Sequence, residues 1–350
     1  MNRGGAQRSR RRVSGAALIA VLLLGLPACT AEAVPTAAPP AVPDGVREVA
    51  ATGAPANDIC TVRRSFAPSD RRPVISRGRL VVGVDPSDAT MSHWDAQRQT
   101  FQGFNIDLVR AVAAALWPGE RDPDDRISFT VVPPGQGGFE MLTSGQIDMI
   151  ATSLTATCAR ARQVVFSADY LDSGQTALVR RVDGRPQYPG MEHLGGRRVC
   201  AAARTTSLAA VTGYRTAQGR TLVPVQAAHA VDCLVMLRQG QVDAVSTDEN
   251  ILLGFTRMAP DTMLVTEPPP DNARFCSYHG KDRPCTWFTD EPHSFAFAPG
   301  NEDLVRFVNH VLSSPAGATV WQEAHDRWLD DHPDRGRPTP GEPVSSWPPD

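Results

Sequence analysis

The chain has 350 residues, of which 41% are apolar, so it can bury one large hydrophobic core or two smaller ones. Its formal charge is −3, and no basic stripe lies outside the N-terminus, which excludes a nucleic-acid-binding protein. Both ends are rich in proline, so we expect roughly 260 ordered residues between them.

The N-terminus has the pattern of an export signal. Five arginines precede an apolar run over residues 16–26, which is short for a membrane-spanning helix but suits a signal peptide. The run ends in the letters LPAC, which resemble a lipobox. We therefore expect a signal peptide over residues 1–28 and a lipid on the thiol of Cys29, with an uncleaved anchor as the alternative. The letters SRRRV leave two export routes open, the general secretory and the twin-arginine route.

Cleavage there would remove five arginines and lower the formal charge from −3 to −8. Residues 29–58 are rich in alanine and proline and cannot build a core, so we interpret them as a lipid-anchored linker. Residues 333–350 are again Pro-rich and are predicted to be a disordered tail.

Six cysteines remain beside Cys29, and an even number in an exported chain suggests three disulfides with fifteen possible connectivities. Cys276 and Cys285 lie in one polar loop and are the easiest pair, and Cys200 and Cys233 could meet within one βαβ unit. The pair that is left is Cys60–Cys158, so we favour Cys276–Cys285, Cys200–Cys233 and Cys60–Cys158. The alternative for the polar loop is a zinc site made of Cys276, His279, Cys285 and His293. Its spacing is irregular, so we expect no metal.

Strand and helix patterns alternate in the first half of the folded region. Strands are predicted over residues 79–85, 128–132 and 147–153, with helices over 103–116 and from Phe139 to Gly145. This alternation predicts a doubly wound α/β domain whose ligand site lies at the carboxyl ends of the strands.

A second α/β unit follows, with strands over 197–202, 221–225 and 242–246 and helices beginning near Thr205 and at Ala230. Strand-like segments over 175–179 and 294–298 lie on either side of this unit and are predicted to be a two-strand hinge. The helices after Glu302 should return to the first unit.

The segment LTATCARARQVVFS, residues 154–167, carries the strongest site pattern. Thr155 and Thr157 have the period-two spacing that points both hydroxyls the same way along a strand. Arg160 follows where the strand pattern ends. A guanidinium beside hydroxyls at a strand-to-helix junction is a good carboxylate receptor, whereas a solvated surface arginine is the alternative.

Five separated blocks resemble the polar amino-acid solute-binding proteins of ABC importers. They are GRLVVGVD, GFNIDLVRAVA, LTSGQIDMIATSLTATCARARQVVFSADYL, RRVCAAARTTSL and GQVDAVSTDENIL, and the resemblance covers residues 75 to 330. The cysteines and the letters TTSL and DAVSTD look most like the actinobacterial glutamine-binding lipoproteins. The resemblance implies a type II periplasmic-binding-protein-like α/β fold. Lobe 1 would comprise 59–176 and 296–332, and lobe 2 would comprise 177–295 with an inserted loop over 268–289.

The resemblance also implies roles for individual residues. Arg160 would clamp the α-carboxylate of the ligand, and Asp248 would pair with its α-ammonium, unless Asp248 is only a helix N-cap. The hydroxyls that would assist Arg160 belong to Thr155, Thr157, Thr205 and Thr206. The side-chain pocket would be lined by Asp85, Asp88 and Met91.

One departure from the family pattern is Arg204, which stands where the family usually has glycine. It could favour an acidic ligand or simply point outward. The inserted loop could cap the cleft or contact a partner.

Three function classes follow. The first is a lipid-anchored receptor, expected to be monomeric, that delivers glutamine, glutamate, aspartate or asparagine to an ABC importer outside the cytoplasm. The second is a sensor that uses the same receptor to inform a membrane signalling protein. The third is an enzyme on the same fold, which we do not expect because Glu192 and Glu249 lack a catalytic motif. No cofactor is expected.

Overall fold

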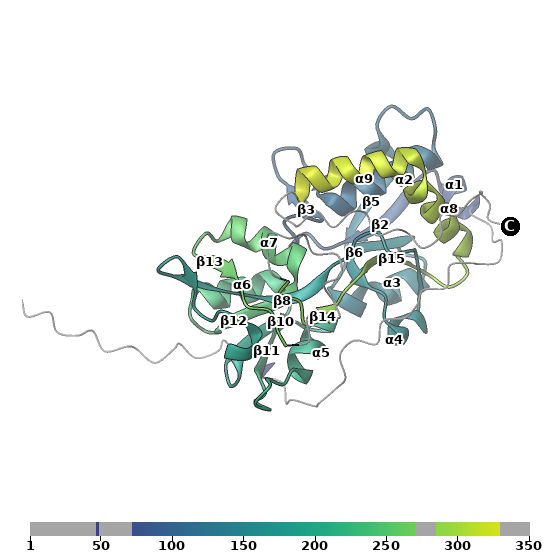
Figure 1. Cartoon of the computed structure of the whole chain (residues 1–350). Coiled ribbons are helices and arrows are strands. Elements are labelled where there is room, and N and C mark those ends of the chain that lie inside the picture. Colours follow the sequence, from purple (N-terminus) through teal and green to yellow (C-terminus); the bar gives the residue numbers. More distant parts are fainter. Residues whose placement is uncertain (1–46, 49–71, 271–284, 330–350) are drawn as a thin grey trace, which may run out of the picture. The chain divides into compact units, whose positions relative to one another are not determined.

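The structure is a computed structural model that describes residues 47–48, 72–270 and 285–329 (Figure 1). These residues form two α/β lobes, each built on one principal sheet with helices on both faces. The predicted signal peptide, Cys29 and the tail lie outside the described residues. None of the helices described in the chain is long and apolar enough to cross a membrane.

The sheet of lobe 1 has five strands in the order β5-β2-β6-β15-β7. Their bounds are β2 Leu80–Val84, β5 Ile127–Val131, β6 Met149–Thr155, β7 Val165–Phe166 and β15 His293–Phe297. β2 runs parallel to β5 and β6, whereas β15 pairs antiparallel with β6 and β7. β15 therefore completes this sheet from a distant part of the sequence (Figure 1).

Successive side chains of β6 enter different cores because a strand points them alternately to opposite faces. Met149 and Ala151 belong to the core under helices α2 (Phe104–Leu116), α8 (Glu302–Ser313) and α9 (Pro315–Trp328). Ile150 belongs to the opposite core with α3 (Phe139–Thr143). Residues of α8 and α9 share this core with the strands β2 and β6.

The sheet of lobe 2 contains the path β1-β11-β10-β12-β8-β13, and β9 and β14 pair with β8. The bounds are β1 Arg47–Glu48, β8 Gly174–Val182, β9 Arg185–Pro186, β10 Arg198–Ala202, β11 Val223–Ala227, β12 Ala244–Asp248, β13 Thr262–Leu264 and β14 Thr289–Asp290. Helices α6 (Ala230–Arg238) and α7 (Glu249–Met258) cover one face and α5 (Thr206–Gly213) covers the other.

The two lobes are joined by two chain segments that run antiparallel beside each other. Leu171 forms a β-bridge with His293, and Gln175 pairs with Thr289. Trp287 packs against Gly174, where a Cβ would lie 2.1 Å from the indole ring, so no larger residue fits. The predicted two-strand connection is therefore present, although β8 belongs to the sheet of lobe 2 and β15 to that of lobe 1.

Several short elements escaped the sequence patterns. β3 (His93–Asp95) and β4 (Thr100–Gln102) form a hairpin that precedes α2, and α1 spans Arg72–Arg77. β1 lies inside the predicted linker and pairs antiparallel with β11. Two- and three-residue strands bury too few side chains to leave a periodic signal in the sequence.

The disulfide Cys200–Cys233 is present and joins β10 to α6. Cys158 and Cys285 are also disulfide-bonded, whereas their expected partners Cys60 and Cys276 lie outside the described residues. No group of three or more potential metal-ligating side chains was found among the described residues.

We expect the double variant Cys200→Ala/Cys233→Ala to lower the free energy of unfolding by about 3–4 kcal/mol. The disulfide closes a loop with a sequence separation of 33 residues and so restricts the unfolded chain. Denaturant unfolding of the oxidised proteins measures the difference. An unchanged midpoint would show that the packing of α6 alone holds this part of lobe 2.

Candidate functional site

A pocket lies between the lobes at the carboxyl ends of the strands, where α/β folds place their ligands. Asp85 follows β2, Thr155 ends β6 and Asp248 ends β12. The full set of lining residues is Asp85, Ser87, Asp88, Pro134, Gly135, Thr152, Ser153, Leu154, Thr155, Arg160, Ala202, Thr205, Thr206, Ser207, Ala230, Thr247, Asp248 and Ile251.

Arg160 enters the pocket from the short helix α4 (Cys158–Ala161), which begins after its N-cap Thr157. The Thr157 hydroxyl accepts a hydrogen bond from the backbone N–H of Arg160. The guanidinium is 3% exposed and donates one hydrogen bond, of 2.7 Å, to the Thr155 carbonyl. Burial lowers the pKa of Arg160, and the charges of Glu291 and Asp248 oppose that shift. The other donors of the guanidinium make no hydrogen bond to the described residues and can take a carboxylate.

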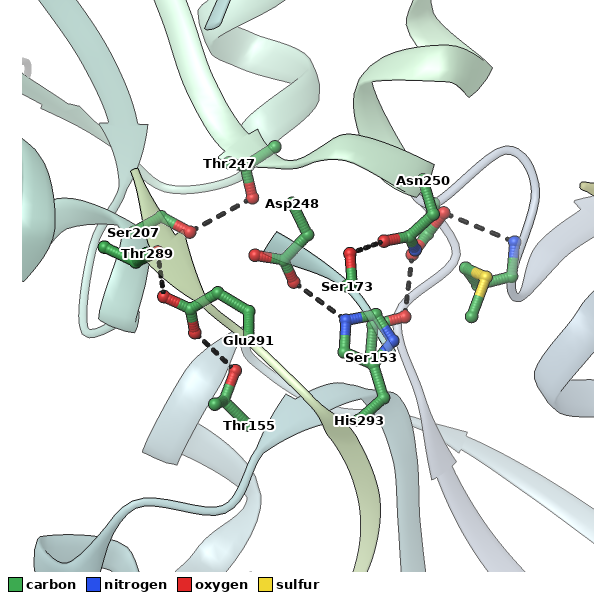
Figure 2. Close-up of polar contacts among 12 residues, drawn as sticks. Ser153, Thr155, Ser173, Ser207, Thr247, Asp248, Asn250, Thr289, Glu291 and His293 are labelled. Atoms are coloured by element: carbon green, nitrogen blue, oxygen red, sulfur yellow. Dashed lines mark hydrogen bonds and ion pairs between the residues drawn. The ribbon is translucent and has the colours of Figure 1, made fainter. Parts of the chain in front are cut away.

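Asp248 faces the pocket from lobe 2, at the junction of β12 and α7. It holds the N-cap position of α7, but its side chain makes no capping hydrogen bond. Instead, Oδ2 lies 3.0 Å from Nε2 of His293, while Oδ1 is buried with no hydrogen-bond partner among the described residues (Figure 2). An unsatisfied buried carboxylate oxygen is costly, so this atom is suited to a positively charged ligand group.

Glu291, which the sequence patterns did not indicate, lies beside the predicted carboxylate receptor. Its Oε2 accepts a 2.7 Å hydrogen bond from the Thr155 hydroxyl, and its Oε1 accepts one of 2.9 Å from Thr289 (Figure 2). Thr206 contributes another side-chain hydrogen bond. Burial, and next the charge of Asp248, raise the pKa of Glu291 to about 8.

Asp88 is a third buried acid, on the lobe 1 side of the pocket. It accepts hydrogen bonds from the Ser153 hydroxyl, at 3.2 Å, and from the backbone N–H of Met91, at 3.3 Å. Burial, assisted by the nearby charge of Asp85, raises the pKa of Asp88 to about 7.

The structure gathers seven of the ten predicted binding residues in the lining of one pocket: Asp85, Asp88, Thr155, Arg160, Thr205, Thr206 and Asp248. The other three are outside that lining. Thr157 caps α4, Met91 is buried in the lobe 1 core, and the Arg204 side chain is exposed. Arg204 has φ 62°, a left-handed conformation that favours glycine, which accounts for glycine at this place in the family pattern.

Other lining residues were missed by the sequence patterns. Ser87, Ser207 and Thr247 are sequence neighbours of predicted binding residues. A prediction that included the residues on either side of each candidate would have found them. Ser207 and Thr247 hydroxyls lie 3.1 Å apart and join α5 to β12 (Figure 2). Glu291 and His293 are not lining residues but contact two of them, Thr155 and Asp248. They had no such signal, because only the hinge brings their segment to these residues.

Two of the contacts between the described parts of the lobes involve Gly135 and Thr90. Gly135 of lobe 1 lies against the backbone of Arg204, where a Cβ would be 2.2 Å from the Arg204 carbonyl oxygen. On another side, the Thr90 hydroxyl donates a 3.1 Å hydrogen bond to the Asn250 carbonyl. With these contacts formed, the lobes are in a closed arrangement.

The raised pKa of Glu291 predicts a pH-dependent stability. An unfolded glutamate ionises near its ordinary value of 4.5, whereas folded Glu291 keeps its proton until about pH 8. Between these values the folded state binds more protons, so the free energy of unfolding should fall as pH rises, by up to about 1.4 kcal/mol per pH unit. Glu291→Gln removes this dependence. Denaturant unfolding at pH 5, 7 and 9 should show the variant gaining stability relative to wild type.

The exposed Glu140→Gln on α3 is the matched control and should show a constant difference from wild type. Parallel pH profiles for wild type and Glu291→Gln would contradict the assigned pKa.

Comparison with known proteins gives the same architecture. Residues 80–331 match the family model of bacterial extracellular solute-binding proteins, family 3. The ABC transporter glutamine-binding protein GlnH of Bacillus subtilis (strain 168) is 24% identical over 258 residues, covering 73% of this chain and 82% of that protein.

Two solved structures have similar folds. The arginine-bound form of truncated ArgBP from T. maritima has a TM-score of 0.55 and 26% identity, over 69% of this chain and 98% of that one. The solute receptor for L-cysteine of Neisseria gonorrhoeae has a TM-score of 0.61 and 18% identity, over 76% of this chain and 96% of that one. Because the family model spans most of the chain, this protein belongs to family 3 of the bacterial extracellular solute-binding proteins.

Proposed function

We propose that this protein is a lipid-anchored receptor that binds a polar amino acid in the pocket between its lobes and delivers it to an ABC importer. The observation that carries the proposal is the pairing of one buried cation, Arg160, with one incompletely satisfied carboxylate, Asp248, across a single pocket. An amino-acid zwitterion needs these two groups, one for its carboxylate and one for its ammonium.

The two groups come from different lobes, so a zwitterion that contacts both stabilises the closed arrangement more than the open one. An importer that recognises only the closed receptor would then respond to the ligand. The contacts of Gly135 and Thr90 between the lobes involve no charged group.

The names of the relatives support an amino-acid ligand. These proteins are named as binding glutamine, arginine or cysteine. The three amino acids share the α-carboxylate and α-ammonium and differ only in the side chain. The proposed membrane anchor rests on the LPAC sequence that ends at Cys29. Membership of a family of binding proteins identifies the chain as a receptor and not an enzyme.

Arg160→Ala tests the carboxylate contact. Removing one partner of a desolvated charge pair should weaken amino-acid binding by at least about 2 kcal/mol, which is more than tenfold in Kd. Isothermal calorimetry against the amino acid that binds wild type measures this loss. Arg162→Ala, two residues along and exposed, is the control and should keep the wild-type Kd. Equal affinities for all three proteins would refute the role of Arg160.

Gly135→Ala tests closure at a lining position that offers no side chain to the ligand. The added Cβ would meet the Arg204 carbonyl and hold the lobes apart, so we expect Kd to rise about tenfold or more. Gly145→Ala is the matched control, because Gly145 also has a positive φ (74°) but no atom within 4 Å of the added Cβ. Both variants should lose similar stability in the open state, and calorimetry compares their affinities. If Gly145→Ala weakens binding as much, the effect comes from backbone strain and not from closure.

A further inference from the structure

We propose that His293 is a positioning residue for ligand binding. It fixes one oxygen of the Asp248 carboxylate, so that the other oxygen faces the α-ammonium of an amino acid. This inference rests on the function proposed above and adds to the ammonium site a residue that the sequence patterns did not indicate. His293 is not a lining residue, and it acts on the ligand only through Asp248.

The contact between these two side chains crosses from one lobe to the other. His293 is the first residue of β15 in lobe 1, whereas Asp248 ends β12 in lobe 2. Nε2 of His293 lies 3.0 Å from Oδ2 of Asp248, and both side chains are almost fully buried (Figure 2). An ionised carboxylate only accepts hydrogen bonds, so Nε2 carries the proton of this bond.

The imidazole is held in place by contacts that do not involve the pocket. The backbone N–H of His293 donates to the Leu171 carbonyl, and the His293 carbonyl accepts from the N–H of Tyr170, both at 2.8 Å. The Tyr170 ring meets the imidazole edge-on, with ring centroids 6.2 Å apart, and stacks on Phe295 at 4.3 Å. His293 is therefore fixed before a ligand arrives, and a carboxylate bonded to it takes a defined position.

The bond to His293 keeps the Asp248 carboxylate from capping its own helix. An aspartate at an N-cap position commonly accepts a hydrogen bond from the backbone N–H of the second or third helical residue. Asp248 makes no such bond to α7, and its Oδ1 is buried without a hydrogen-bond partner among the described residues. His293 thus draws Oδ2 away from the helix end and leaves Oδ1 for the ammonium group.

The second ring nitrogen indicates why this position holds a histidine. Nδ1 of His293 is buried and has no hydrogen-bond partner among the described residues. Buried polar atoms without a partner are uncommon and cost stability. An apolar residue would fill this part of the core without that cost. Within the described residues, the bond to Asp248 is the one hydrogen bond of the imidazole, and it accounts for the choice of residue.

Calorimetry with the twenty amino acids identifies the tightest ligand of wild type, and the variants are then titrated with it. His293→Leu fills the core but removes the donor, so the Asp248 carboxylate can turn to α7 and Kd should rise about tenfold or more. His293→Gln offers an amide N–H near the former Nε2 and should return Kd to within about threefold of wild type. If His293→Leu does not fold, His293→Asn replaces it, because the shorter amide does not reach Asp248.

The matched control is His325→Leu. His325 is another buried histidine of lobe 1, stacked on Trp321 in α9, and it does not line the pocket. Loss of its imidazole should leave Kd at the wild-type value, which separates the contact with Asp248 from the general loss of a buried ring.

A second ligand separates positioning from packing. Each protein is also titrated with the α-hydroxy analogue of the same amino acid, which keeps the carboxylate and the side chain but lacks the ammonium group. The analogue cannot form the charged contact with Asp248. The wild-type preference for the amino acid over the analogue should therefore shrink about fivefold or more in His293→Leu. A variant with only a packing defect would weaken both ligands by the same factor.

The outcomes distinguish this inference from the function on which it rests. The role of His293 is wrong, and the amino-acid receptor stands, if His293→Leu weakens the amino acid and its analogue equally or keeps Kd within about twofold of wild type. The same conclusion follows if His293→Gln binds no better than His293→Leu. If no amino acid gives heat with wild type, the proposed function is wrong, and the role of His293 with it.

Discussion

The pocket depends on the buried positive charge of Arg160. Arg160 is almost fully removed from solvent and contributes a single hydrogen bond to its own lobe, with Glu291 and Asp248 as the acids whose charges favour its ionised form. A desolvated guanidinium is expensive unless carboxylates surround it. Asp248, one of these acids, also lines the pocket, so the cost of burying Arg160 and the polarity of the pocket are linked.

The hinge determines where those acids lie. Glu291 lies between β14 and β15, and His293 is the first residue of β15. His293 forms a β-bridge with Leu171, so this returning segment passes beside the outgoing one. From there Glu291 reaches Thr155 in lobe 1 and Thr289 in lobe 2, while His293 reaches Asp248 (Figure 2). The polar centre of the pocket is consequently built partly from the hinge, and a change in the angle between the lobes would alter these contacts as well as the width of the pocket.

Asp248 has the backbone position of a helix cap, but its side chain does not cap the helix. By backbone position it is the N-cap of α7, the structural alternative that the sequence left open. Its carboxylate makes no capping bond, because Oδ2 is directed to His293 and Oδ1 is left without a partner among the described residues. α7 therefore begins without a capping hydrogen bond from this side chain, and the Asp248 carboxylate remains available for a ligand.

The sequence by itself determined the order of strands and helices, the two-lobed α/β fold and the pocket at the strand ends. Buried strands and amphipathic helices leave local periodic patterns, and Arg160, Thr155 and Asp248 stand where those patterns end. It could not place Glu291, exclude Arg204 from the pocket lining or reveal the contact of Gly135 with lobe 2. Those features were decided by tertiary structure, because each depends on residues far apart in the chain that meet only when the hinge brings the lobes together.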